Sequence, residues 1–462
     1  MLDQGIVTVY LVAILGLGLW SSRRIDSMQQ FAVAGRNFTS LVIFATLSAS
    51  FIGGGFSIGN AEKVFLFGIA NIVALWGFSL KEILVGTFIA PRMDRFTDIL
   101  SVGDIMKRDY GTMGQVITGV FSFLLCAGIV GAQVGGIGIV FHVFTGMPHT
   151  LGILIGCGIV ITYTTFGGMR AIIFTDVVQF LVLAIAIPAA LWLGIRQAGG
   201  WEAVLEAVPQ THLQIPGDAM STIAFLSLFL TFVLGETLVP PYVQRLYIGR
   251  NANHTARGTL LSGLFSIPFF AVTGLIGLVA LALQPDLDAN LALPFVIREV
   301  LPMGIRGIAI AGVISIVMSS ADSFLNAASI ALTHDIVKPV LGSRISPKQE
   351  LLLAKLTTVA VGILAVFLAI RIRSVLDILI FAYNFWAPVI LIPLTATLLG
   401  VRSNRWSFLA GAIAGIIGTL AWNATLMSTT GVDGLIIGVF CNMCVFALAT
   451  TFSSPPPTYP VM

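Results

Sequence analysis

Charged residues are scarce in this sequence. Of its 462 residues, 10% are Asp, Glu, Lys or Arg and 57% are hydrophobic. A soluble globular domain carries about 25% charged residues, so the composition excludes a soluble protein built around one core. The net charge of +3 comes without a run of basic residues, which argues against a nucleic-acid partner.

Cysteine and histidine are scarce as well. The four cysteines all lie within apolar segments, so we expect no disulfide framework. The five histidines are scattered singly, without the spacing of a metal site and without a partner for catalysis. Since neither a nucleophile–base pair nor a metal motif is evident, we do not expect an enzyme.

Long apolar runs dominate instead. Runs of about 17 or more residues can cross a bilayer as helices, and an all-α integral membrane protein of about thirteen spans is predicted. The approximate limits of the spans are 5–20, 40–60, 64–90, 114–145, 150–166, 172–195, 222–240, 258–283, 306–333, 351–370, 375–400, 407–425 and 433–452. The count becomes twelve if 150–166 is re-entrant.

The basic residues predict an orientation. With thirteen spans and the N-terminus outside, one set of loops collects 17 of the 24 Lys and Arg residues, Arg245 among them. Loops rich in Lys and Arg stay in the cytoplasm. We therefore expect a multi-pass protein of the cell's inner (plasma) membrane, with its N-terminus outside and its C-terminus in the cytoplasm.

The ninth run contains the stretch VMSSADSFLN, residues 317–326. Polar residues recur there every three or four positions, which places them on one helix face: Ser315, Ser319, Asp322, Asn326, Ser329 and Thr333. Lipid cannot satisfy such a face, so it must look into the protein or a water-filled path. Serines alone would fit helix packing, but hydroxyls together with a carboxylate favour a hard cation.

The second run is interrupted by glycine. In the stretch TLSASFIGGGFSIG, residues 46–59, Gly53, Gly54 and Gly55 are consecutive. Glycine is a poor helix former, so we expect the helix to unwind over all three. In transporters, unwound backbone at membrane depth supplies carbonyls to Na⁺ and helix ends to the solute. Close helix packing through small residues is the alternative.

Other charged residues lie inside apolar runs, including Lys81, Glu82, Asp176 and Glu236. Adjacent helical residues point about 100° apart, so Lys81 and Glu82 are not expected to face one site. Separate ion pairs with neighbouring helices and a contact with the solute are both open for these two residues.

Five stretches resemble the sodium:solute symporter family: FAVAGRN (31–37), IGGGFSIGNAEKVF (52–65), GGMRAIIFTDVVQ (167–179), PPYVQR (240–245) and MSSADSFLNAASIALTHDI (318–336). The resemblance implies a fold of the leucine-transporter type, with two inverted repeats of five core helices. For this chain it implies the following segments: a first peripheral helix and cytoplasmic loop (1–38), a first repeat (39–196), an extracellular loop (197–219), a second repeat (220–402), two peripheral helices (403–452) and a disordered tail (453–462).

The resemblance also implies a function and ion sites. It implies a secondary active transporter that couples Na⁺ to uptake of a small organic solute by alternating access. A first Na⁺ is expected between the hydroxyls of Ser319 and Ser320 and the backbone carbonyls of Ile43, Thr46 and Ile316. Some family members bind a second Na⁺, and the matching positions here are Asp176, Ser319, Asp322 and Ser323. Whether a second ion binds in this chain is open.

The solute positions most resemble those of the choline-transporter branch, whose aromatic side chains enclose a quaternary ammonium. Phe51 and Phe78 match that cage, whereas Val239 stands where the branch has a tryptophan. Lys81, one turn from Phe78, would repel a cation and attract a carboxylate, so a small carboxylate or zwitterion is preferred. The other positions expected to line the solute are Ser48, Ser50, Gly53 and Tyr242.

Other functions stay open. One is a Na⁺ symporter for choline or another quaternary ammonium, and another is an H⁺-coupled transporter that uses Asp176 or Asp322 as its proton relay. A transporter-like sensor is less favoured, because no cytoplasmic domain follows residue 452. The expected partners are the solute, Na⁺ and the lipid bilayer, and a monomer is our expectation for the assembly.

Overall fold

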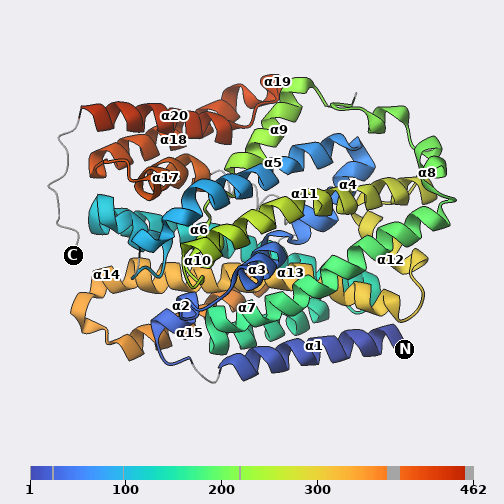
Figure 1. Ribbon diagram of the computed structural model, residues 1–462, viewed down its shortest axis with the longest axis horizontal. Helices are drawn as coiled ribbons and strands as arrows, with labels where there is room; N and C mark the ends of the chain where they lie inside the picture. The colour runs from blue at the N-terminus through green and yellow to red at the C-terminus, as the bar shows by residue number, and fades with distance from the viewer. Residues whose placement is uncertain (1, 23–24, 97, 218–219, 372–384, 453–462) are drawn as a thin grey trace.

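The computed structural model describes residues 2–22, 25–96, 98–217, 220–371 and 385–452 (Figure 1). Within these ranges the chain is helical, and the one β-type pairing is a parallel bridge between Phe38 and Gly249. The all-α prediction is confirmed for this part of the chain. The expected tail, 453–462, lies outside the described residues.

The helices follow one another with mostly short connections. Up to residue 207 they are α1 (Leu2–Ser21), α2 (Met28–Val33), α3 (Ser40–Phe51), α4 (Gly54–Phe67), α5 (Ala70–Leu84), α6 (Val102–Thr145), α7 (His149–Gln197) and α8 (Trp201–Ala207). Then come α9 (Thr222–Leu234), α10 (Pro240–Leu246), α11 (Ala252–Leu283), α12 (Ala292–Val300), α13 (Ile305–Ile330), α14 (Lys338–Leu341), α15 (Pro347–Arg371), α17 (Ile392–Leu399), α18 (Arg405–Thr425), α19 (Met427–Thr430) and α20 (Gly434–Thr451). Wider π-helical turns occur at Val85–Ile89, Ala331–Val337 and Ala387–Leu391.

The membrane character of the chain is clear from these helices. Among the described residues, nine helices are long and apolar enough to cross a membrane, and the bent pair α3–α4 makes a tenth span. The shorter helical segments Thr222–Leu234 and Ala387–Leu399 are also apolar. The expected spans 150–166 and 172–195 both lie within α7, which consists of two helices joined at a kink at Gly168, where the backbone is non-helical with a φ of 48°. A total of thirteen spans stays a prediction.

The predicted break in the second span is present, but it is shorter than expected. Helix α3 ends at Phe51, α4 begins at Gly54, and the two axes differ by 54°. Gly54 and Gly55 are therefore helical rather than unwound, because a single change of direction at Ile52–Gly53 is sufficient. The second half of the broken span also continues to Phe67, beyond the expected limit of 60.

Helix α13 lies at the centre of the bundle, whereas α1 and the pair α18 and α20 lie along opposite edges (Figure 1). In the most apolar window of the span Ile305–Leu341, 94% of the residues are buried, against 22% for α1. The main neighbours of α13 are α7, α6, α1, α15 and α3. A helix enclosed by protein can carry polar side chains that lipid would not satisfy, so α13 is suited to hold the polar stripe.

Candidate functional site

The polar stripe of α13 is fully enclosed. Ser315, Ser319, Asp322, Asn326 and Ser329 are all 0% exposed. Ser315 meets the hydroxyl of Tyr10 on α1, and Ser319 and Ser320 turn toward α7 and α3. The prediction that this face looks into the protein is confirmed.

Helix α13 meets the broken helix at Ser320, next to the stripe residue Ser319. The Ser320 hydroxyl donates to the backbone carbonyl of Ser50 at 2.8 Å and lies 3.4 Å from that of Ile316. A Cβ atom on Gly53 would lie only 2.5 Å from Ser320 Oγ, so glycine permits this approach. The last four carbonyls of a helix have no intrahelical partner. The end of α3 therefore offers backbone oxygens beside a hydroxyl of α13.

Two of the predicted carbonyl ligands lie elsewhere. On the continuous helix α3, Ile43 precedes Ser50 by about 10 Å along the axis and Thr46 precedes it by about 6 Å. Their carbonyls stand in regular helix, where each accepts the N–H group four residues on. Ile43 packs against Gly258 of α11 instead. The carbonyl that Ser320 contacts is that of Ser50 rather than of Ile43 or Thr46, because α3 continues to Phe51 before it breaks.

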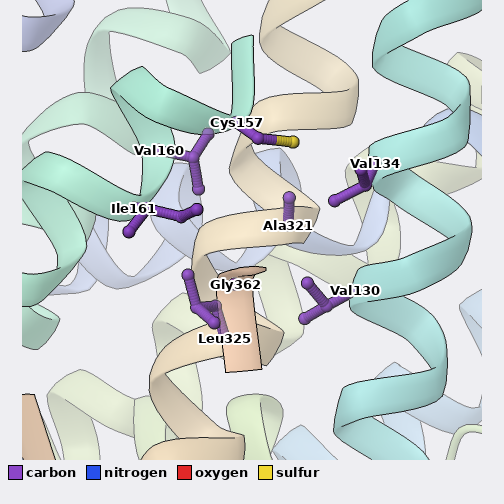
Figure 2. Close-up of a pocket in the computed structure, with 8 residues that line it drawn as sticks. All are labelled: Val130, Val134, Cys157, Val160, Ile161, Ala321, Leu325 and Gly362. Atoms are coloured by element: carbon purple, nitrogen blue, oxygen red, sulfur yellow. The ribbon is translucent and has the colours of Figure 1, made fainter. Parts of the chain in front are cut away.

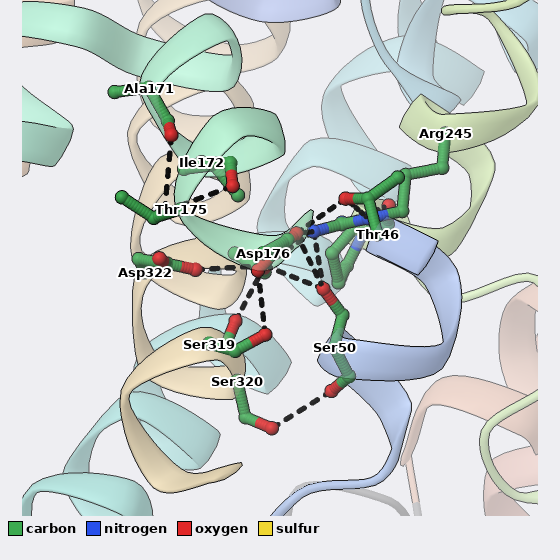
Figure 3. Close-up of polar contacts among 12 residues, drawn as sticks. Thr46, Ser50, Ala171, Ile172, Thr175, Asp176, Arg245, Ser319, Ser320 and Asp322 are labelled. Atoms are coloured by element: carbon green, nitrogen blue, oxygen red, sulfur yellow. Dashed lines mark hydrogen bonds and ion pairs between the residues drawn. The ribbon is translucent and has the colours of Figure 1, made fainter. Parts of the chain in front are cut away.

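Asp176 of α7 is the centre of a buried hydrogen-bond network (Figure 3). Its Oδ1 accepts a hydrogen bond from Ser319 Oγ at 2.7 Å. Its Oδ2 accepts from the hydroxyls of Thr46 and, at 3.3 Å, of Ser50. Ser50, which was expected to line the solute, thus belongs to this hydrogen-bond network. The structure brings Asp176 together with Ser319, as predicted for a second Na⁺ site.

Arg245 reaches into the same network and is 0% exposed. Its Nη2 lies 2.8 Å from Asp176 Oδ2 and donates to Ser323 Oγ at 2.7 Å. Its Nε donates to Thr46 Oγ1 and its Nη1 to the carbonyl of Pro241, both at 3.0 Å. The basic-residue count had placed Arg245 in a loop. That placement is wrong, because α10 carries the side chain inward.

Asp322 has its own partners. Tyr163 of α7 donates to Asp322 Oδ2 at 2.5 Å, and the hydroxyl of Ser323 lies 3.0 Å from Oδ1. Both Tyr163 and Asp322 are 0% exposed. Sequence reasoning missed Tyr163, because an aromatic residue in an apolar run carries no signal of its own. Sequence reasoning could have found Arg245, because two buried carboxylates on facing helices need a cation nearby.

Four of the expected solute residues, three aromatic residues and Lys81, lie together in the structure. The ring of Phe51 lies 5.0 Å from that of Phe78 and 6.2 Å from that of Tyr242, measured between centroids. The Lys81 ammonium lies 3.5 Å from the centroid of Phe78 and 4.7 Å from that of Tyr242. These four residues come from α3, α5 and α10, so the prediction that they share one site has a geometric basis.

Lys81 and Glu82 pair with each other. The Lys81 Nζ lies 3.0 Å from Glu82 Oε1, and the side chains are 1% and 3% exposed. Lys81 also donates to the backbone carbonyl of Glu236 at 3.3 Å, and the Glu236 carboxylate accepts from the Tyr242 hydroxyl at 2.9 Å. The expectation that Lys81 and Glu82 point apart is wrong, because two long side chains can bend together although their Cβ directions diverge.

The remaining predicted solute positions are Ser48, Val239 and Gly53, and each has contacts of its own. Ser48 meets the hydroxyl of Ser262 on α11 at 3.0 Å. Val239 is fully buried at the start of α10, where its carbonyl accepts the N–H of Tyr242 at 3.0 Å. Gly53 lies against Ser320 and Gln133.

Two further features lie away from the polar network. A small apolar crevice behind α13, lined by Val134, Cys157, Val160 and Leu325 among others, holds no charged side chain (Figure 2). Where α6, the π-turn Ala331–Val337 and α15 meet, His334 lies 2.9 Å from Asp104 and 2.6 Å from Glu350. His334 is therefore part of an ion-pair cluster rather than an isolated residue.

Comparisons with known proteins agree with this arrangement. The model of the sodium:solute symporter family matches residues 31–418. A high-affinity choline transporter 1 of Caenorhabditis elegans is 26% identical, with 92% of this chain and 78% of the relative covered. The high-affinity proline transporter PutP of Bacillus subtilis is 24% identical, with 88% and 89% covered.

A solved structure confirms the fold. A Na⁺-coupled sialic acid symporter, in a substrate-bound outward-open state, matches with a TM-score of 0.86 at 20% identity, covering 100% of this chain and 99% of that one. At this identity the likeness concerns the fold, an all-helical transporter fold of the leucine-transporter type. Since the family model covers most of the sequence, the chain belongs to the sodium:solute symporter family.

Proposed function

We propose that this protein carries a small organic carboxylate or zwitterion into the cell together with Na⁺, by alternating access. Family membership supports Na⁺-coupled symport of a small solute. The solute class is inferred from one observation, the buried ammonium of Lys81 held against the rings of Phe78 and Tyr242.

The proposed Na⁺ position lies at the junction of α3 and α13. Its ligands are the hydroxyls of Ser319 and Ser320, the carbonyl of Ile316, and backbone carbonyls at the end of α3, which lack intrahelical partners. Oxygen ligands of this kind suit a hard cation. In the structure Ser320 bridges the two helices by its bond to Ser50, and the ion would take over this bridging contact.

The proposed solute position is the aromatic group beside Lys81. Aromatic rings attract a cation placed within about 6 Å of their centroids. Here the Lys81 ammonium already occupies such a place, at 3.5 Å and 4.7 Å from two centroids. A quaternary ammonium would have to displace this like charge from the rings, whereas a carboxylate could pair with it in place of Glu82.

The mechanism follows from linkage between the two positions. Na⁺ bound at the end of α3 would hold the break between α3 and α4, and α3 also carries Phe51 of the solute position. Each Na⁺ entering down 100 mV gains about 2.3 kcal/mol from the voltage alone. The repeat boundaries, the outward N-terminus and the cytoplasmic C-terminus predicted from the sequence belong to the same proposal.

A ligand screen tests the solute class. The melting temperature of the detergent-purified protein would be measured in NaCl and in KCl with small carboxylates, amino acids, their methyl esters and choline. A carboxylate or amino acid should raise it in NaCl, its methyl ester should not, and Lys81→Met should remove the effect. The control is Lys63→Met, whose side chain is 40% exposed. Stabilisation by choline, without a carboxylate effect, would contradict the proposal.

Choline is the second candidate because the centroids of three aromatic rings lie 5.0–6.3 Å from one another. Phe51, Phe78 and Tyr242 could enclose a quaternary ammonium if Lys81 moved toward Glu82, with which it is already paired. The same screen separates the two. Proteoliposome uptake of the stabilising compound in a Na⁺ gradient then establishes transport.

A further inference from the structure

Arg245 lies among the oxygen atoms that were predicted to hold a second Na⁺. Of the four predicted ligands, Asp176 and Ser323 bond directly to its Nη2, at 2.8 and 2.7 Å. Ser319 donates to the other oxygen of the same Asp176 carboxylate, at 2.7 Å. The guanidinium therefore stands where a second ion would find its ligands (Figure 3).

The fourth predicted ligand, Asp322, is engaged on the far side of the group. Its Oδ2 accepts from Tyr163 at 2.5 Å, and its Oδ1 faces the Ser323 hydroxyl at 3.0 Å. A hard cation takes several oxygen ligands at once. In this arrangement it would have to compete with Arg245 for both Asp176 and Ser323.

The cation supplied by Arg245 is permanent. A guanidinium does not lose its proton in proteins, and it presents several donors in a fixed planar fork. The guanidinium is anchored to α10, its own helix, because Nη1 donates to the carbonyl of Pro241 at 3.0 Å. A further donor, Nε, binds Thr46 Oγ1 on α3 at 3.0 Å. Arg245 thus links α10, α3, α7 and α13 as a bound ion would.

We propose that the Arg245 guanidinium is a built-in substitute for a second sodium ion, so that the protein binds and couples a single Na⁺. This inference rests on the proposed function, since it counts the ions of that symport. Asp176 then acts as a positioning residue: it orients Ser319 toward the remaining Na⁺ position while Arg245 neutralises its charge.

The test is the number of Na⁺ ions bound per chain. Equilibrium dialysis of radiolabelled NaCl against the detergent-purified full chain gives this number without knowledge of the solute. One ion per chain, lost in Ser319→Ala/Ser320→Ala, is the expected result. Two ions per wild-type chain would overturn the inference while leaving Na⁺ symport intact. No bound Na⁺ would overturn the proposed function, and the inference with it.

Substitutions of Arg245 sharpen the test. Arg245→Gln removes the built-in charge and should raise the count to two, whereas Arg245→Lys keeps a cation and should leave it at one. The matched control is Arg250→Gln, because Arg250 is exposed and donates to the carbonyl of Asn37 outside the network. A folded Arg245→Gln protein that still binds one ion would also count against the inference. If that variant does not fold, the wild-type count alone decides.

Discussion

Replacement of Lys81 by methionine is expected to destabilise the protein strongly. The substitution keeps an unbranched apolar stem but removes the ammonium that lies 3.0 Å from Glu82, and Glu82 is only 3% exposed. Removal of one partner from a buried ion pair typically costs about 3–5 kcal/mol, because the other charge stays buried and unpaired. We therefore expect Lys81→Met to lower the free energy of unfolding by about that amount.

A double variant separates the ion pair from other contributions. In Lys81→Met/Glu82→Gln no charge of the pair is left, and such replacements are often close to neutral. The carbonyl of Glu236 still loses its donor, which costs about 1–3 kcal/mol. The double variant should thus recover about 2 kcal/mol or more of the loss seen in the single variant.

The assay is chemical denaturation in detergent, with four proteins compared in KCl so that Na⁺ binding does not contribute. They are the wild type, the two variants above and Lys63→Met. Lys63 also pairs with its neighbouring residue, Glu62, but at 3.4 Å and with side chains 40% and 30% exposed. An exposed pair contributes about 0–1 kcal/mol, so this control should change little. A double variant as unstable as Lys81→Met would refute the reasoning.

Three further predictions follow from individual contacts. Gly53→Ala should weaken Na⁺ binding in the same dialysis assay, because its Cβ would lie 2.5 Å from Ser320 Oγ. Gly55→Ala, whose Cβ would meet nothing within 4 Å, should bind Na⁺ normally. Tyr163→Phe should lower the free energy of unfolding by about 1.5–3 kcal/mol, because Asp322 loses the hydroxyl that donates to it at 2.5 Å. An unchanged denaturation midpoint would count against that hydrogen bond. His334→Gln should lower the free energy of unfolding by about 3 kcal/mol or more, because Asp104 and Glu350 lose a shared partner. The double variant Asp104→Asn/His334→Gln should restore part of that stability.

The central helix was predictable because its pattern is regular. Six polar residues at a spacing of three or four, from Ser315 to Thr333, lie on one face of any helix. Burial of that face then follows from the cost of polar groups in lipid. The break near Gly53 was predictable for a similar reason, since glycine marks the point where α3 can approach Ser320.

The exact ligands were not predictable, because they depend on where α3 stops. Three glycines indicate that a helix will break, but not which one carries the bend. A shift of a few residues moves a carbonyl by several ångströms along the axis. Ile43 and Thr46 were expected at the site from the family resemblance, whereas the carbonyl of α3 that contacts Ser320 is that of Ser50, near the end of the helix.

Arg245 and Lys81 illustrate a second limit. Counting charges by loop assigns Arg245 to the surface, because two prolines just before it suggest a helix end. Those prolines instead begin α10, which turns the side chain inward. The Lys81–Glu82 pair depends on side-chain bending that a helical wheel omits. Long charged side chains are thus the least predictable part of the site.

The most direct test of Na⁺ coupling compares the melting temperature of the purified protein in NaCl and in KCl at equal ionic strength. A ligand that binds only the folded state stabilises it by about 2.7 kcal/mol at a concentration 100 times its Kd. The account predicts a saturable rise in NaCl that disappears in Ser319→Ala/Ser320→Ala. Equal melting temperatures in the two salts would contradict the proposed Na⁺ site at the junction of α3 and α13.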